Sequence, residues 1–196
     1  RRHRPIRAWS PTPAASTPSL ETMYDAATRY LTLANERVSR INVFLAGPEP
    51  STDAAFLDVA YSWVAEDSTA EPIPPYTRLD SNRAPFGQMT AERGTELFYI
   101  RDIFADLADY PRLCQFFDTG NAHNVIISAL NPRQQWLGVL TIESHDAGAF
   151  DESYQRFVDT LGDQIAIALE NQMLFQEAQQ EARQALALAE ASGLAN

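Results

Sequence analysis

The sequence predicts an α+β fold: a single antiparallel β-sheet of five or six strands, with an N-terminal and a longer C-terminal helix packed on one face. Apolar residues recur at helical spacing near both ends of the chain and alternate with period two between them. Turn residues separate the alternating segments, as expected for antiparallel strands. Helix, strands and helix in that order fit one sheet with helices to one side.

The first helix is predicted over residues 19–36. Thr17-Pro18 offers a cap and a first helical position. The apolar residues that follow at helical spacing are Leu20, Met23, Tyr24, Ala27, Leu31 and Ala34. Residues 1–18 contain four prolines among alanine, serine and threonine, and are predicted to be a disordered linker.

Two strands joined by a turn are expected next. Ile41, Val43 and Leu45 alternate before the break at residues 47–50. Alternation then resumes through Leu57, Val59, Tyr61 and Trp63. Residues 71–95, rich in proline, are predicted to be mostly a long loop, and loops of this length are usually functional.

The second half of the chain predicts a short strand at residues 97–103 and a helical or irregular cover at residues 106–117. Two strands, at residues 124–130 and 135–144, complete the sheet around a turn at Asn131-Pro132-Arg133. From Asp151 the apolar period returns to 3.6, and no helix breaker occurs before Gly193. The last helix is therefore predicted to exceed about 35 residues, with the domain over residues 19–176 and a coiled-coil-like extension over 177–196.

The last helix carries two weak heptad patterns, which predict a dimerising and signalling helix. One register consists of Ile165, Ala168, Gln172, Phe175, Gln179, Ala182, Leu186 and Ala189. The competing register consists of Ile167, Leu174, Ala178, Ala185 and Leu188. The sequence does not choose between them, and a single exposed helix end is the alternative.

Charge and composition exclude several classes of protein. From Glu21 onward lie all 26 acidic residues but only 11 of the 15 arginines, so nucleic acid and anionic lipid are not expected partners of the folded part. The absence of lysine excludes a P-loop, a protein kinase and Schiff-base chemistry. A single cysteine and no apolar run of membrane-spanning length indicate a cytoplasmic protein without membrane insertion.

No catalytic or metal site is predicted. Ser144, His145 and Asp146 are triad residue types, but three consecutive residues cannot form a triad, and they are interpreted as a turn between strand and helix. The three histidines share no ligand-like spacing, so no metal is expected.

Residues 125–175 resemble the C-terminal half of a GAF domain. The resemblance is carried by Leu137-Gly138-Val139-Leu140 and Glu143-Ser144, by Phe150 before acidic residues, and by the helical run from Gln164 to Asn171. It extends over about residues 20–176 in the order of elements. It implies a PAS-like plan with a small-molecule pocket on the sheet face opposite the terminal helices.

The resemblance also implies a function. The first and last helices of such domains commonly pack into a homodimer and pass signals to a downstream effector domain, such as that of a histidine kinase, cyclase or transcription regulator. We therefore expect a non-enzymatic sensor and dimerisation module. The alternatives are a ligand-free structural dimerisation domain and an enzyme like the methionine sulfoxide reductases of this family.

No cofactor is assigned, and bilin, haem and cyclic nucleotide stay open. Bilin-binding relatives attach the chromophore to a cysteine often followed by histidine, but Gln115 follows Cys114 here. A reductase needs a second thiol, which the chain lacks. Haem would need His123 or His145 as its ligand, and the lysine of cyclic-nucleotide-binding members is missing.

The pocket is expected to be lined by sheet residues facing away from the terminal helices and by the segments that cover them. Aromatic walls with a few polar groups suit a small planar or amphipathic ligand. The candidates are Tyr61, Trp63, Phe98, Asp102, Cys114, Phe116, Phe117 and Asn124.

Overall fold

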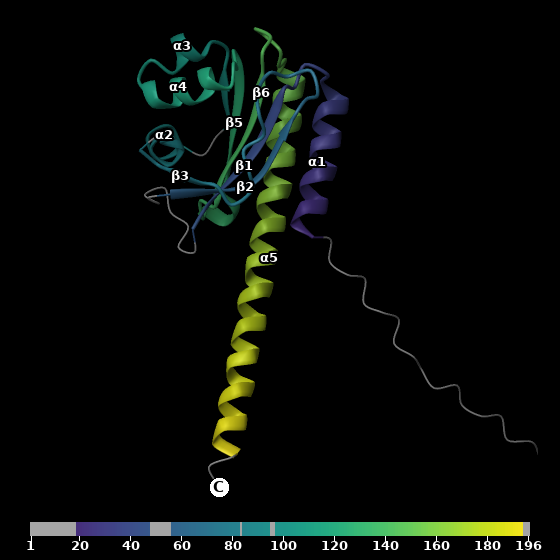
Figure 1. Ribbon diagram of the computed structural model, residues 1–196, viewed down its shortest axis with the longest axis vertical. Helices are drawn as coiled ribbons and strands as arrows, with labels where there is room; N and C mark the ends of the chain where they lie inside the picture. The colour runs from purple at the N-terminus through teal and green to yellow at the C-terminus, as the bar shows by residue number, and fades with distance from the viewer. Residues whose placement is uncertain (1–18, 48–55, 83, 95–96, 194–196) are drawn as a thin grey trace, which may run out of the picture.

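The computed structural model describes residues 19–47, 56–82, 84–94 and 97–193, so the linker predicted over residues 1–18 lies outside the described residues. In this part of the chain, six strands form one antiparallel sheet in the order β3-β2-β1-β6-β5-β4. Helices α1 and α5 lie side by side on one face, and α2, α3 and α4 lie on the other (Figure 1). The predicted α+β architecture is confirmed.

The elements have the following bounds. The strands are β1 (Arg40–Ala46), β2 (Phe56–Val64), β3 (Arg78–Asp80), β4 (Phe98–Ile100), β5 (Asn124–Leu130) and β6 (Gly138–Ser144). The helices are α1 (Leu20–Ala34), α2 (Phe86–Arg93), α3 (Ile103–Asp106), α4 (Pro111–Thr119) and α5 (Glu152–Gly193), with a 3-10 turn η1 (Pro132–Gln134).

Helix α1 begins at a side-chain cap. Ser19 Oγ accepts a hydrogen bond from the backbone N–H of Thr22 at 3.2 Å, which satisfies one of the free donors of the first turn. The cap expected at residues 17–18 lies outside the described residues. Tyr24, Ala27 and Leu31 form the buried stripe of α1, at the spacing that the sequence predicted.

Two hydrophobic clusters lie on the two faces of the sheet. Ile41 and Val43 of β1 join the cluster under α1 and α5, which we call the α5 face. Phe44 of the same strand joins the cluster under α2, α3 and α4, which we call the α4 face. The central strands β1 and β6 are therefore covered on both sides, and every residue of β6 is buried.

A β-bulge in β2 changes which residues reach each face. Val43 lies opposite Tyr61, but Phe44 lies opposite Val59, so Ala60 is an extra residue. Val59 consequently packs on the α4 face, whereas Tyr61 packs on the α5 face, where its ring centroid lies 5.3 Å from that of Tyr24. Strict alternation in the sequence cannot show this change of side.

The segment predicted to be mostly a loop over residues 71–95 contains β3 and α2, so the prediction is wrong for those residues. Strand β3 is only three residues long and extends the sheet beside β2. Helix α2 is short, and its Phe86 and Met89 are fully buried in the cluster on the α4 face. Elements this short give little periodicity, and packing stabilises them instead.

Helix α5 is a single helix of 42 residues, as predicted from the absence of a breaker. At a rise of about 1.5 Å per residue it is about 63 Å long. Val158, Ile165 and Leu169 pack against the sheet, whereas the helix beyond Asn171 is largely exposed. Figure 1 shows this second part running past the edge of the sheet.

Gly138 is required where β6 meets β1. Its φ of +151° is unfavourable for other residues, and a Cβ placed there would lie 2.0 Å from the carbonyl oxygen of Phe44. We expect Gly138→Ala to lower the free energy of unfolding by about 2–4 kcal/mol, measured by urea denaturation. Gly148→Ala is the control, because Gly148 also has positive φ but no atom lies within 4 Å of its Cβ position. Equal losses in the two variants would show that the β1–β6 contact is not responsible.

Candidate functional site

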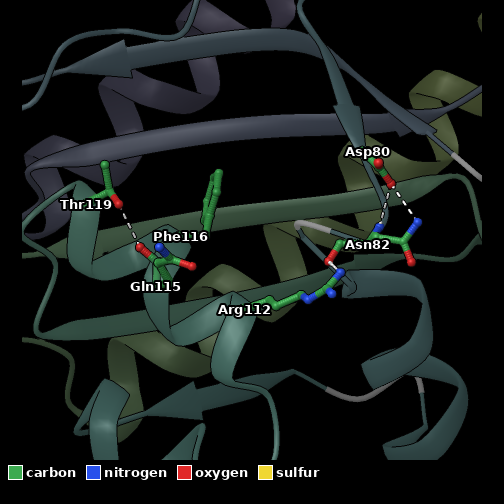
Figure 2. Close-up of a pocket in the computed structure, with 6 residues that line it drawn as sticks. All are labelled: Asp80, Asn82, Arg112, Gln115, Phe116 and Thr119. Atoms are coloured by element: carbon green, nitrogen blue, oxygen red, sulfur yellow. Dashed lines mark hydrogen bonds between the residues drawn. The ribbon is translucent and has the colours of Figure 1, made fainter.

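A cavity of about 580 Å³ lies between α4 and the end of β3, on the α4 face. Its lining residues are Asp80, Asn82, Arg112, Gln115, Phe116 and Thr119 (Figure 2). The four that α4 contributes follow the spacing i, i+3, i+4 and i+7, so they form one side of that helix. The volume is in the range of small-molecule sites.

Helix α4 is held so that this side faces the cavity. Pro111 occupies its first turn, where a missing N–H has no cost. Leu113 and Phe117 are fully buried and anchor the adjacent side of the helix in the cluster on the α4 face. Because those two residues fix the rotation of α4, the neighbouring side is directed to the cavity.

Asn82 holds two charged groups at the cavity. Its backbone N–H and its Nδ2 donate to Asp80 Oδ1 at 2.8 and 3.0 Å. Its carbonyl oxygen accepts a hydrogen bond from Nη1 of Arg112. Figure 2 shows Arg112 extending from α4 toward Asn82, with Asp80 beyond it. A carboxylate and a guanidinium are thus oriented by one residue.

A buried ion pair lies deeper on the same face. Arg40 Nε and Nη2 donate to Oε2 of Glu143 at 2.9 and 2.5 Å, joining β1 to β6. The Glu143 residue is 0% exposed. Burial raises the pKa of the Glu143 carboxyl, and the charge and hydrogen bonds of Arg40 oppose that rise.

Neutral side chains complete this buried network. Asn42 Nδ2 donates to Glu143 Oε1 at 2.9 Å and to Thr141 Oγ1 at 3.2 Å. Ser62 donates to Asn42 Oδ1 at 2.8 Å and accepts from the backbone N–H of Ile73 at 2.9 Å. The network therefore connects β6, β1, β2 and the segment before β3. It also gives the buried charges the hydrogen-bond partners that they require.

The ion pair also supports α4. Gly120, at the C-terminal end of α4, lies so close to Arg40 that a Cβ there would be 2.1 Å from Nη2. The ring of Phe116 lies 5.9 Å from the guanidinium carbon of Arg40. Phe116 thus contacts the cavity and packs near the buried cation.

Of the eight predicted pocket residues, the structure places one, Phe116, in the lining of the cavity. Phe117 is fully buried in the cluster on the α4 face, and Phe98 packs against that cluster. Tyr61 and Trp63 lie on the α5 face because of the bulge at Ala60.

The remaining predicted residues have local structural contacts. Asp102 caps α3 by accepting from the backbone N–H groups of Phe104 and Ala105. Asn124 is buried and donates to the carbonyl oxygen of Ile100 at 2.7 Å. Cys114 is partly buried and packs against the cluster on the α4 face.

Sequence reasoning missed the polar lining and the buried network. A signal for the network was present, because Arg40 and Asn42 alternate with Ile41 and Val43 on an otherwise apolar strand. Glu143 occupies a matching position on β6. No comparable signal marks Asp80 or Asn82, which lie at the end of a strand of three residues.

The turn predicted between strand and helix follows β6, and its side chains make local contacts. Ser144 Oγ accepts from the backbone N–H of Asp146 at 3.1 Å. The ring of His145 bonds to the carbonyl oxygen of Asn121 at 2.6 Å and to Ser68 Oγ at 2.9 Å, so it joins two loops. No group of His, Cys, Asp and Glu side chains in the described ranges is placed to hold a metal.

A family model described as "GAF domain" matches residues 102–171. These residues include α4, the central strand β6 and the first half of α5. The match identifies residues 102–171 as part of a GAF domain. The resemblance expected from residues 125–175 is thereby confirmed. No curated protein sequence matches the chain.

Solved structures share the fold of this GAF domain. The red/green cyanobacteriochrome NpR6012g4 in its red-light-absorbing state is 18% identical, with 81% of this chain and 99% of that chain covered and a TM-score of 0.63. The GAF domain of a two-component sensor histidine kinase from Bacillus halodurans is 15% identical, with coverages of 82% and 99% and a TM-score of 0.61. The type II free methionine-R-sulfoxide reductase from Thermoplasma acidophilum is 12% identical, with coverages of 78% and 93% and a TM-score of 0.55.

Across the described residues, none of the helices combines the length and apolar character needed to cross a membrane.

The buried ion pair provides a test of how the GAF domain is stabilised. We expect Arg40→Met to lower the free energy of unfolding by about 3–5 kcal/mol, because it leaves the Glu143 carboxylate without its cation. The double variant Arg40→Met, Glu143→Met should recover much of that loss. The exposed pair Arg78–Asp58 is the control, and Arg78→Met should leave the urea midpoint almost unchanged. A double variant as unstable as Arg40→Met would contradict this account.

The environment of Cys114 predicts an unreactive thiol. Burial raises its pKa, and the carboxylates of Asp118 and Asp102 raise it further. Because only the thiolate reacts with iodoacetamide, alkylation at neutral pH should be slower than for a small free thiol, and its pH midpoint should lie higher. Asp118→Asn should lower that midpoint. A midpoint below that of the free thiol, measured by mass spectrometry of quenched samples, would refute the prediction and make Cys114 a candidate attachment site.

Proposed function

We propose that the chain is a regulatory sensor and dimerisation module of a larger cytoplasmic signalling protein, without catalytic activity of its own. A small molecule would bind in the cavity beside α4, and α5 would carry the response to a downstream effector domain. The observation that carries this proposal is the continuity of α5. One helix contacts the sheet through Val158 and Ile165 and extends unbroken to Gly193.

The exposed residues of α5 favour a homodimer in one of the two predicted registers. Ile165 is 2% exposed and packs against the sheet, so it is not available to a partner. Ile167, in contrast, is 47% exposed, and Leu174 lies one heptad further along the same side. The register of Ile167, Leu174, Ala178, Ala185 and Leu188 therefore points away from the domain. The outward Tyr30 and Leu33 give α1 apolar surface as well.

The cavity and α5 are connected by contiguous contacts. Phe116 lines the cavity and packs near Arg40, and Arg40 binds Glu143 of β6. Strand β6 leads through a short turn into α5. A ligand that favours one position of Phe116 would bias this chain of contacts, within the limit of its differential affinity for the two states.

Several observations support a non-enzymatic role. Thiol redox catalysis needs a thiolate, which the raised pKa of Cys114 disfavours, and the chain has no second cysteine to complete a redox cycle. Ser144 and His145 make structural contacts instead of forming a nucleophile–base pair.

A ligand-free dimerisation domain is the second candidate. The aromatic cluster on the α4 face favours it, because Phe44, Phe86 and Phe117 are fully buried, with Phe44 stacked on Phe86 and Phe117 in edge contact with Phe86. In that case α5 would still join two copies, but the cavity would have no role.

Native mass spectrometry of the purified chain tests both candidates. We expect a dimer, with additional non-covalent mass if a ligand is retained. Leu174→Arg should shift the equilibrium toward monomer by about tenfold or more, because it places a charge in the apolar seam of each helix. Gln180→Arg is the control, since residue 180 lies on the opposite side of α5. A wild-type monomer, or equal effects of the two variants, would overturn the dimer. Additional mass that survives denaturation would indicate covalent attachment.

A further inference from the structure

The cavity beside α4 presents two opposite charges that do not neutralise each other. Arg112 and Asp80 both line it, yet neither takes part in an ion pair with another residue that the structure describes. Asn82 hydrogen-bonds to both and so fixes where each lies. Such preorganisation lowers the cost of ordering the two groups around a ligand.

Both charged groups retain hydrogen-bonding capacity. Arg112 uses Nη1 for the carbonyl oxygen of Asn82, and the guanidinium has five N–H donors in all. Asp80 uses Oδ1 for Asn82, and its second carboxylate oxygen is a further acceptor. The geometry therefore offers a cationic fork and an anionic acceptor within one cavity.

The charges restrict the class of ligand. Among the described lining residues, a phosphate or other multiply charged anion would meet one guanidinium beside a carboxylate, on a protein with a net charge of −11. A simple cation would be attracted to Asp80 but repelled by Arg112. Only a ligand with separate positive and negative groups gains from both side chains.

Resting on the sensor function proposed above, we propose that this cavity binds a zwitterionic metabolite of the α-amino acid class. Arg112 binds its carboxylate through charge-assisted hydrogen bonds, and Asp80 binds its ammonium group. Phe116 supplies an apolar wall for the side chain, and Gln115 adds an amide at the same cavity. A cavity of about 580 Å³ has room for such a molecule together with bound water.

The experiment uses the purified chain and the standard L-amino acids, each tested singly by thermal shift and then by isothermal titration calorimetry. Each amino acid that binds is compared with its N-acetyl derivative, which lacks the positive charge, and its carboxamide, which lacks the negative charge. We expect at least one amino acid to bind, and each derivative to bind about tenfold more weakly or worse.

Two variants assign the charges to residues. Arg112→Gln should weaken the binding of the amino acid about tenfold or more. It should leave the affinity for the carboxamide nearly unchanged, since that derivative has no carboxylate for Arg112 to bind. Asp80→Asn should weaken the binding of the amino acid by a similar factor and leave the affinity for the N-acetyl derivative nearly unchanged. Arg78→Gln and Asp58→Asn make the same charge changes at the exposed pair outside the cavity, and should have no effect.

The outcomes separate this inference from the sensor proposal. If no amino acid binds, or if the two cavity variants bind like the two controls, the zwitterion inference is overturned. A dimer with another non-covalent ligand in the native mass spectrum would leave the sensor proposal intact in that case. An amino acid that binds with the expected pattern to a strictly monomeric chain would instead support the site and contradict the dimer.

Discussion

Burial of the central strands on both faces is the constraint on which the structure depends. Alternate residues of strands β1 and β6 lie on the α5 face and on the α4 face, so no side chain in the middle of these strands reaches water. Charged groups in such strands must be neutralised and hydrogen-bonded within the protein. Arg40 and Glu143 meet that condition through each other, and Asn42 supplies the additional donor to the carboxylate.

The same alternation gives the two faces different chemistry. On β6, Leu140 and Ile142 join the apolar cluster beneath α1 and α5, while Glu143 belongs to the polar network beneath α4. The α5 face is a conventional apolar packing surface suited to holding a helix. The α4 face combines aromatic packing with fixed polar groups, which is the composition expected of a site that discriminates among small molecules.

The sequence predicted the elements with strong periodicity and missed those defined by tertiary contacts. Both terminal helices, the strands β5 and β6 and the relation to GAF domains follow from patterns within single segments. The face of the sheet on which Tyr61 and Trp63 lie does not follow from such a pattern, because the bulge at Ala60 depends on the pairing of β2 with β1. The cavity was found only in part, through Phe116, since its other groups come from β3, the following turn and α4, which only the fold brings together.

Because α5 is uninterrupted, its length sets the angular orientation of any domain that would follow it. In a continuous helix, inserting or deleting one residue rotates everything beyond it by about 100° and moves it by about 1.5 Å. The direction in which a following domain faces is therefore fixed by the number of residues between it and Leu169, the last fully packed position on the sheet. Chimaeric proteins built on this domain should behave alike only when their junctions differ by about seven residues, which nearly restores the angle.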